Sequence, residues 1–386
     1  MINVARSSKF KIRADLENSH GSYLADKNTG KEYLDFFSMY SSLPLGYNHE
    51  IFKTDEFQSE VAKILSAKIT NCEFISDEAE SFDKEFKAFA GIGKYEYIHY
   101  CCTGALAVEA AIKTAIDYKK SKEPKILSFV GAFHGINSWG CFTTSRNGPV
   151  QHRLKGFPSH FSIKTRDDVS KDFLENIFAN DNITAVLVEP IQATLGDHYI
   201  SIEFIKTLRD LCDKYDIPLI FDEVQIGFGA TGKVWYFEHL GVEPDILIFG
   251  KRAQLSGIMV KERFSKIFET PTRLEVTWDG TIIDMIRCKY IIKAYKEYDI
   301  LNNAKQSGDL LADGLRSVKD LKNVRNCGLI MAFDFETAET CNEYSDKMFD
   351  RGMLFNKTGD KTIRFRPSLA LSKEELEKSL KIIFSI

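Results

Sequence analysis

The chain has 386 residues, of which 44% are hydrophobic and 27% charged, so a disordered protein is excluded and a large buried core is expected. Lysine and arginine total 51 against 55 aspartates and glutamates, and this net charge of −4 argues against a general nucleic-acid-binding protein. No apolar run reaches membrane-spanning length and residues 1–20 contain no apolar signal core, which predicts a cytoplasmic protein without membrane contacts.

Short apolar runs alternate with amphipathic stretches through the middle of the chain. This alternation indicates βαβ units and a mainly parallel sheet that is buried on both faces. The pattern then changes to one long helix and a mixed region. The predicted strands are 97–102, 125–130, 184–188, 217–221, 245–249 and 328–334, and the predicted helices begin at 104 and cover 201–215, 280–300 and 372–381.

These elements predict an α/β protein in three parts. Residues 1–50 form an N-terminal segment that joins a smaller domain, and residues 51–280 form a large domain with the mainly parallel sheet. Residues 281–386 form an interdomain helix and a small α+β domain.

Three ionisable residues directly follow three of the predicted strands. Glu189, Asp222 and Lys251 each come after an apolar run, and ligands of open parallel sheets bind beyond the carboxyl ends of the strands. One acidic residue in such a place is usually an ion-pair partner or a helix cap, but three ionisable residues at the same relative place indicate a site. Gly104 lies in a turn before a helix, where free N–H groups and the helix dipole can hold a phosphate.

Several common cofactors do not fit this pattern. The chain has no Walker A ending and no G-x-G-x-x-G fingerprint, so neither a nucleoside triphosphate nor NAD is favoured. Eight cysteines lack metal-ligand spacing, so we expect reduced, mostly buried thiols and no metal site. A phosphate cradle, a strand-end aspartate and a strand-end lysine are together what pyridoxal phosphate requires.

An ordered series of motifs runs from Tyr33 to the C-terminus. Its members are 34–49 (LDFFSMYSSLPLGYNH), 104–109 (GALAVE), 132–135 (AFHG), 188–192 (VEPIQ), 221–232 (FDEVQIGFGATG), 249–254 (FGKRAQ), 277–280 (TWDG) and 363–367 (IRFRP). This series resembles class III, fold type I, pyridoxal-phosphate-dependent aminotransferases, and within them it is most similar to the L-lysine 6-transaminases. The resemblance implies the fold of that family, a large domain with a mainly parallel sheet plus a smaller α+β domain.

The resemblance also implies roles for single residues around the cofactor ring. Lys251 would bind the cofactor as a Schiff base and then move a proton between substrate and cofactor. Asp222 would keep the pyridine nitrogen protonated, which makes the ring an electron sink. Phe133 and Val224 would pack on opposite faces of the ring, and Gln225 would bind its hydroxyl group.

The resemblance further implies which residues bind the phosphate group of the cofactor and that the active site is shared between two subunits. Gly104 and Ala105 would bind the phosphate through backbone N–H groups, and Thr277 would reach it from the partner subunit of a homodimer. Such a homodimer would have shared active sites, with a small-molecule amine and a keto acid as its substrates and no nucleic acid as a partner.

Other residues near these motifs have a structural interpretation beside the functional one. Without the resemblance, Phe133 and Val224 are interpreted as core residues. His134 is interpreted as structural, with its ring bound by neighbouring backbone, and Glu189 as an anchor for the loop beneath the cofactor. Tyr40 and Tyr47 either line the substrate pocket or pack the small domain.

Two positions depart from the pattern of the ω-amino branch of the family. The arginine that commonly follows Phe-His-Gly and binds the distal carboxylate of the donor is Ile136 here. The glutamate that commonly follows Glu-Pro-Ile-Gln is Thr194, so its usual pair with Arg364 of the Ile-Arg-Phe motif cannot form. We therefore expect Arg364 to favour acidic substrates such as 2-oxoglutarate or glutamate, and the donor to be an uncharged or less polar amine rather than L-lysine. A loop nearby carries three cations that could replace the missing contact: Arg146, Arg153 and Lys155.

The predicted function is a ping-pong transfer of an amino group, of the terminal type, between an amine and a keto acid through pyridoxamine phosphate. An aminomutase or racemase of the same fold is the alternative, and it would need no keto acid acceptor. A non-catalytic binding protein is disfavoured because Lys251, Asp222 and Gln225 are all present.

Overall fold

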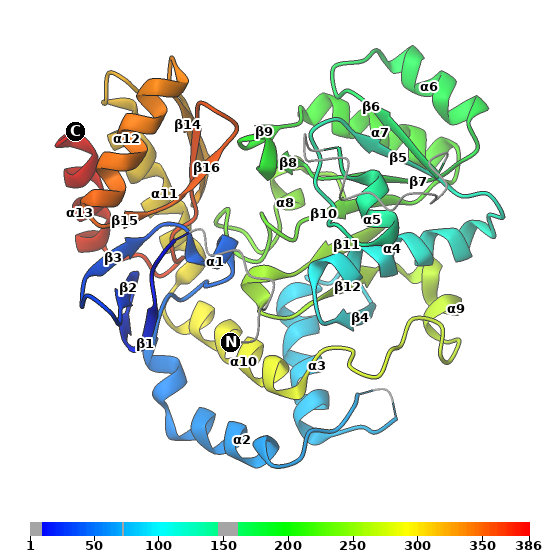
Figure 1. Cartoon of the computed structure of the whole chain (residues 1–386). Coiled ribbons are helices and arrows are strands. Elements are labelled where there is room, and N and C mark those ends of the chain that lie inside the picture. Colours follow the sequence, from blue (N-terminus) through cyan, green and yellow to red (C-terminus); the bar gives the residue numbers. More distant parts are fainter. Residues whose placement is uncertain (1–9, 72, 146–160) are drawn as a thin grey trace, which may run out of the picture.

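The computed structural model describes residues 10–71, 73–145 and 161–386. Its largest sheet within these residues has seven strands (Figure 1), in which β12 runs antiparallel to both neighbours and the other adjacent pairs are parallel. The carboxyl ends of β4, β11, β10, β7 and β5 therefore share one edge. The strands in spatial order are β4 (Tyr97–Cys101), β12 (Ser256–Val260), β11 (Ile246–Phe249), β10 (Leu219–Asp222), β7 (Ile183–Val188), β5 (Lys125–Phe129) and β6 (Ser162–Thr165).

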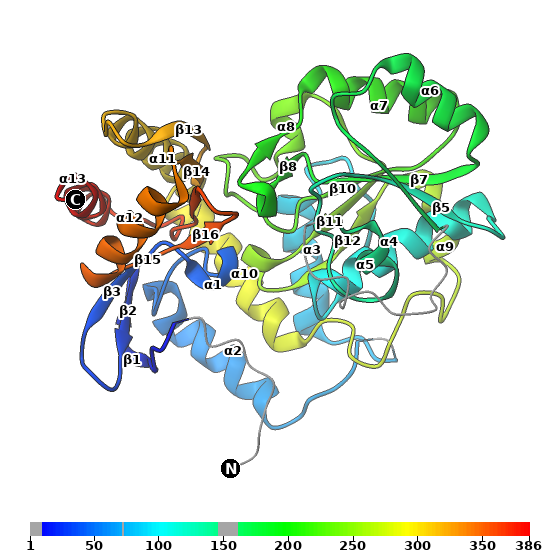
Figure 2. The same ribbon diagram turned by 45° about the horizontal axis from the view of Figure 1, so that its top comes forward.

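Apolar side chains alternate between the two faces of this sheet, and helices cover both faces (Figure 2). On β11, Ile246 and Ile248 pack in one core cluster with α4 (Gly104–Lys119), whereas Leu247 and Phe249 pack in the other with α3 (Asp77–Ala90). The α4 face also holds α5 (Ser138–Thr143) and α9 (Ser265–Phe268), and the α3 face holds α6 (Lys171–Asn180), α7 (Ile202–Lys214), α8 (Phe237–Leu240) and α10 (Ile282–Glu297). Burial on both faces is what continuous apolar runs predict for parallel strands.

Two smaller sheets lie beside the central one, drawn in blue and in orange to red in Figure 1. In the first, β3 pairs in parallel with β15, so the N-terminal segment shares a sheet with the C-terminal part of the chain. Its strands are β1 (Ala14–His20), β2 (Tyr23–Asp26), β3 (Glu32–Asp35) and β15 (Met353–Leu354). The predicted boundaries near residues 50 and 280 stay predictions.

The second smaller sheet, called the C-terminal sheet below, is antiparallel, with the order β13 (Lys322–Cys327), β14 (Ile330–Asp334), β17 (Thr362–Phe365) and β16 (Asn356–Thr358). α11 (Ile300–Arg316) packs on β13, α12 (Ala338–Asp350) on β15 and β17, and α13 (Lys373–Phe384) on α11. The remaining elements include α1 (Ser38–Ser41), α2 (Asp55–Leu65) and the hairpin of β8 (Ile191–Gln192) and β9 (His198–Tyr199).

The predicted strands and the long helix near 280–300 are confirmed, but β12 was not predicted. Only Gly250–Leu255 separates β11 from β12. A connection this short cannot contain a crossover helix, so the strand returns antiparallel to β11. The seven described cysteines are free thiols, and Cys102 alone among them is exposed. No helix in the described ranges has the length and apolarity needed to cross a bilayer.

Candidate active site

The polar segments that follow five strands meet at the shared edge of the central sheet. The helix start at Gly104 follows β4, the turn of residues 130–137 follows β5, and Glu189 follows β7. Asp222 is the last residue of β10, and Lys251 stands two residues beyond β11. This is the edge at which open parallel sheets bind ligands.

Asp222 is buried, and its carboxylate is held from two sides. Nδ1 of His134 lies 2.8 Å from Oδ2, and the backbone N–H of Val224 donates to Oδ1 at 3.1 Å. Because a carboxylate only accepts, the Nδ1–H of His134 is the donor. The His134 ring is only 1% exposed, so it fixes the aspartate from inside the protein. The interpretation that the His134 ring is bound by backbone was wrong: its backbone N–H donates to Thr144, but its ring binds Asp222.

Lys251 has an unusual backbone conformation and a lowered pKa. Its φ of +48° lies in the left-handed region that L-residues rarely adopt, which indicates a constraint imposed by the site. Burial lowers the pKa of the Lys251 amine to about 8, although the negative charges of Asp222 and Glu189 oppose that effect. Near neutral pH most of this amine is still protonated, but its uncharged, nucleophilic fraction is far larger than that of an ordinary lysine.

Glu189 anchors the turn after β5, in agreement with its structural interpretation as an anchor for the loop beneath the cofactor. Its Oε2 accepts a hydrogen bond of 2.7 Å from the backbone N–H of Phe133. Burial, reinforced by the charge of Asp222, raises the pKa of Glu189 well above its usual range.

The N-terminus of α4 lies against two of the other segments. Thr103 caps the helix by accepting from the N–H of Leu106 at 3.4 Å. A Cβ on Gly104 would come within 3.0 Å of Val224 Cγ1, and a Cβ on Gly135 would come within 3.1 Å of Ala105 Cβ. The first turn of α4 therefore packs directly against the segments that contain Phe133 and Val224, and the N–H groups of a first helical turn have no partner within the helix.

Arg364, on β17 of the C-terminal sheet, contacts residues at this edge of the central sheet. The side chain is 7% exposed, and its Nη1 donates to the backbone carbonyl of Ala193 and, at 3.2 Å, to Oε1 of Gln225. The Gln225 carbonyl in turn accepts from Nη1 of Arg252 at 2.8 Å. Arg364 and Gln225 were predicted separately, for substrate and cofactor, and the structure places them in direct contact.

Tyr40 projects from a left-handed turn at the rim of this region. Residues Ser38 to Ser41 all have φ between +45° and +74°, and this turn packs against residues 251–253. Asp35 braces the turn by accepting from the N–H groups of Phe37 and Ser38, both at 2.8 Å, and from Tyr47 at 2.7 Å. Tyr40 is 49% exposed, whereas Tyr47 is buried and supports the turn.

The other residues predicted for the substrate and for the partner's phosphate site are more exposed to solvent. Ile136 is 59% exposed, and Thr277 is exposed beside Trp278. Thr194 is half-buried, and its carbonyl accepts from the Thr358 hydroxyl at 2.7 Å. Arg146, Arg153 and Lys155 lie outside the described residues.

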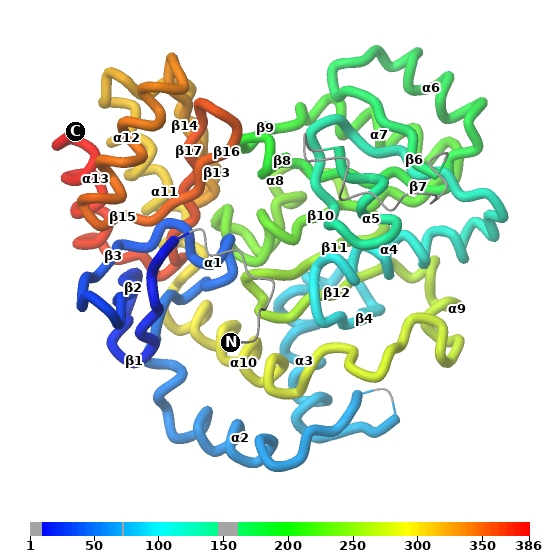
Figure 3. The backbone as a smooth tube through the Cα atoms, in the orientation of Figure 1, coloured from blue at the N-terminus to red at the C-terminus, as the bar shows by residue number. Residues whose placement is uncertain are grey.

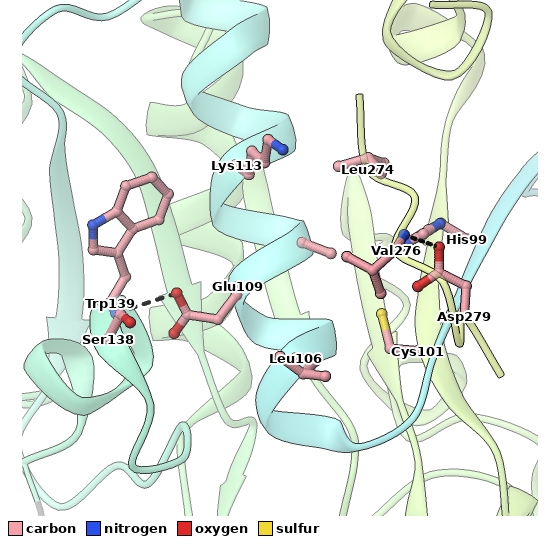
Figure 4. Close-up of a pocket in the computed structure, with 11 residues that line it drawn as sticks. His99, Cys101, Leu106, Glu109, Lys113, Ser138, Trp139, Leu274, Val276 and Asp279 are labelled. Carbon is pink, nitrogen blue, oxygen red and sulfur yellow. Dashed lines mark hydrogen bonds between the residues drawn. The ribbon is translucent and has the colours of Figure 1, made fainter. Parts of the chain in front are cut away.

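A pocket of about 380 Å³ lies between α4 and residues 274–279, and none of the predicted cofactor-binding residues line it (Figure 4). Its walls include Leu106, Val276 and Asp279. Figure 4 shows Glu109 of α4 directed at the backbone of the Ser138–Trp139 segment, where it accepts from the Trp139 N–H at 3.2 Å. Glu109 therefore anchors α5, and the pocket presents a largely apolar wall beside Thr277.

Comparison with known proteins identifies the family. Residues 4–386 match the family model described as aminotransferase class-III. The chain belongs to the class III aminotransferases. This confirms the resemblance of its motifs, and the α/β fold with a mixed, mainly parallel sheet is the fold of the family.

The relatives of this class III aminotransferase act on different amines. The chain is 31% identical to the L-lysine-epsilon aminotransferase of Mycobacterium tuberculosis H37Rv, over 97% of this chain and 91% of the relative. It is 28% identical to the mitochondrial 4-aminobutyrate aminotransferase of Sus scrofa, over 96% and 84%. The solved lysine aminotransferase of M. tuberculosis superposes with a TM-score of 0.88 at 30% identity, covering 97% and 94%.

Class III aminotransferases depend on pyridoxal phosphate, and the donor set at the sheet edge suits that cofactor. A helix N-terminus can accept a phosphate, and a buried carboxylate can face a pyridinium nitrogen. A lysine whose pKa is lowered by burial can form a covalent bond with an aldehyde.

Proposed function

We propose that this class III aminotransferase moves an amino group from an amine donor to a keto acid, with Lys251 and Asp222 as its catalytic residues. The main support for the proposal is the convergence of a half-buried lysine of lowered pKa with a buried aspartate held by His134. Both lie at the sheet edge that also holds the N-terminus of α4. A racemase or mutase would share these groups, so the acceptor requirement distinguishes them.

When bound, pyridoxal phosphate supplies an electron sink for negative charge at the substrate carbon. Lys251 Nζ removes the proton from that carbon and returns it at the other reaction centre, which requires the uncharged amine that burial favours. Asp222 would stabilise positive charge on the ring nitrogen, and the hydrogen bonds from His134 and Val224 hold its carboxylate in place.

The remaining cofactor contacts come from the segments around α4. Gly104 and Ala105 would hold the phosphate through their N–H groups, and Phe133 and Val224 would pack against the ring. Glu189 keeps Phe133 in position through its backbone N–H. Gln225, whose Oε1 accepts from Arg364, would hold the ring hydroxyl.

Substrate selection rests on Arg364, Ile136, Thr194 and Tyr40. Arg364 binds the carboxylate of an acidic keto acid such as 2-oxoglutarate, because a guanidinium and a carboxylate form a bidentate, charge-assisted pair. Ile136 offers no charge to the distal carboxylate of a lysine-like donor, so the donor is an uncharged or less polar amine. Tyr40 lies at the rim, where its exposed ring can contact the donor.

We also propose a homodimer in which Thr277 completes the phosphate site of the partner subunit. Val276 and Trp278, on either side of it, are 55% and 41% exposed, and Leu106 across the pocket of Figure 4 is 39% exposed. Large apolar side chains gathered in this way favour burial against another protein surface. Sedimentation of wild type and a Val276→Asp variant tests this, and a wild type that sediments as a monomer would contradict it.

A half-reaction screen tests the proposed function. Single amines are added to the pyridoxal-phosphate-loaded enzyme, and the cofactor absorbance is followed: glutamate, L-lysine, ornithine, 4-aminobutyrate and several uncharged amines. Loss of the absorbance that 2-oxoglutarate reverses supports transamination. Racemisation or amine migration without any keto acid would instead establish the alternative.

A further inference from the structure

A short segment between β8 and β9, residues 193–197, lies against the C-terminal sheet, and Figure 3 shows the β8–β9 hairpin next to β16. It begins with a 3-10 turn at Ala193–Leu195. Gly196 and Asp197 then follow with φ of +85° and +56°. This conformation turns successive carbonyl groups toward the C-terminal sheet.

Side chains of the C-terminal sheet and the residues next to it bind this segment at four of its five residues. The Thr358 hydroxyl donates to the Thr194 carbonyl at 2.7 Å, and Arg325 Nε donates to the Gly196 carbonyl at 2.9 Å. Arg364 donates to the Ala193 carbonyl. At the far end, Arg366 donates to the Asp197 carboxylate, in an ion pair whose two side chains are at most 1% exposed.

Arg325 is itself held in one orientation. Its Nη1 and Nη2 each lie 3.0 Å from an oxygen of Asp334, which also accepts from the Thr362 hydroxyl at 2.7 Å. A Cβ on Gly196 would come within 3.1 Å of Thr362 and 3.3 Å of the Arg325 guanidinium. The guanidinium therefore packs directly on a residue that has no side chain.

The Ala193 carbonyl is the point at which these contacts reach the substrate site. It accepts from the guanidinium of Arg364, which also donates to Gln225. An arginine side chain has several rotatable bonds, and a fixed acceptor restricts the orientations of its guanidinium. The position of the Ala193 carbonyl in turn depends on how the next residues of the segment are held.

We propose that Thr358 and Arg325 are positioning residues for Arg364. By binding the carbonyls of Thr194 and Gly196 they fix the 193–197 segment, and the segment fixes the guanidinium that receives the substrate carboxylate. The proposal rests on the proposed function of Arg364. It assigns a role to the backbone of Thr194, at the position where the side chain departs from the family pattern.

The test measures binding of the keto acid without needing the natural donor. Apoenzyme is loaded with pyridoxamine phosphate, 2-oxoglutarate is titrated, and the returning cofactor absorbance gives an apparent dissociation constant and a maximal rate. The variants are Thr358→Val, which removes the hydroxyl at nearly constant volume, Thr358→Ser, which retains it, and Arg325→Lys. Thr340→Val, on α12, is the matched control because its hydroxyl pairs with Thr337.

Thr358→Val should raise the apparent dissociation constant by about two- to twelvefold, the equivalent of one neutral hydrogen bond, and Arg325→Lys should also raise it, with the maximal rate unchanged in both variants. Thr358→Ser and Thr340→Val should behave as wild type. An unchanged dissociation constant in Thr358→Val, or a lower maximal rate with no change in binding, would overturn the proposal.

The Arg364→Met variant distinguishes the role of Arg364 in binding the carboxylate from the role of Thr358 and Arg325 in positioning it. If it weakens 2-oxoglutarate while Thr358→Val does not, positioning is wrong and the carboxylate role of Arg364 stands. If Arg364→Met leaves the dissociation constant unchanged, the proposed role of Arg364 fails, and the positioning proposal fails with it.

Discussion

Replacing Ile136 by arginine should make the enzyme use L-lysine better. Position 136 follows the Phe133–Gly135 motif and is 59% exposed. A charge-assisted hydrogen bond to the distal carboxylate contributes about 1.5–3 kcal/mol, which corresponds to roughly 12- to 150-fold in specificity. Because the position is largely exposed, solvent screening places the gain near the lower limit, at about tenfold.

The assay compares two donors that differ only in that carboxylate, L-lysine and 1,5-diaminopentane. The Ile136→Arg variant should raise the ratio of their half-reaction specificity constants about tenfold relative to wild type. Ile136→Gln, of similar length without charge, should leave the ratio nearly unchanged. Efficient use of L-lysine by wild type, with no gain in Ile136→Arg, would refute the reasoning about position 136.

Three further predictions follow from the site and its surroundings. Asp222→Asn keeps the shape of the side chain but loses its charge, so the maximal rate should fall by about a hundredfold or more; a small loss in stopped-flow half-reactions would contradict its role. Burial places the pKa of Lys251 near 8 against 10.5 for an ordinary lysine, so cofactor uptake by the apoenzyme should rise with pH through about 8. The same shift means that the unfolded chain binds more protons between these values, so this residue destabilises the apoenzyme less as pH rises; a midpoint of uptake near 10.5 would be inconsistent with the burial. Arg366→Met leaves the Asp197 carboxylate buried without its cation and should lower the free energy of unfolding by about 3–5 kcal/mol, measured by urea denaturation.

The residues at strand ends were predictable because parallel strands place their carboxyl ends at one edge. Three apolar runs were enough to predict that the residues after them, Glu189, Asp222 and Lys251, lie at one edge of the sheet. The structure brings their segments together there. The contact between His134 and Asp222 was not predictable in this way. The two residues are far apart in sequence, and β7 separates the strands that precede them, so only the three-dimensional path of the turn after β5 brings the ring to the carboxylate.

The contacts that the C-terminal sheet makes at the candidate site could be predicted only in part from the sequence. The Ile-Arg-Phe motif identified Arg364, but its partners depend on how two separate sheets pack. Thr194 was interpreted through its side chain, whereas the structure uses its backbone carbonyl. Backbone acceptors leave no residue-type signal, so the contacts of the 193–197 segment could be found only from the fold.

We expect Lys251 to carry the cofactor of this aminotransferase. The enzyme loaded with pyridoxal phosphate is reduced with borohydride, which fixes the cofactor to the amine that holds it, and the digested protein is mapped by mass spectrometry. The added mass should appear on the peptide containing Lys251 and should be lost in a Lys251→Ala variant that still folds. Cofactor mass on another lysine, or unchanged labelling in the variant, would show that Lys251 does not carry the cofactor.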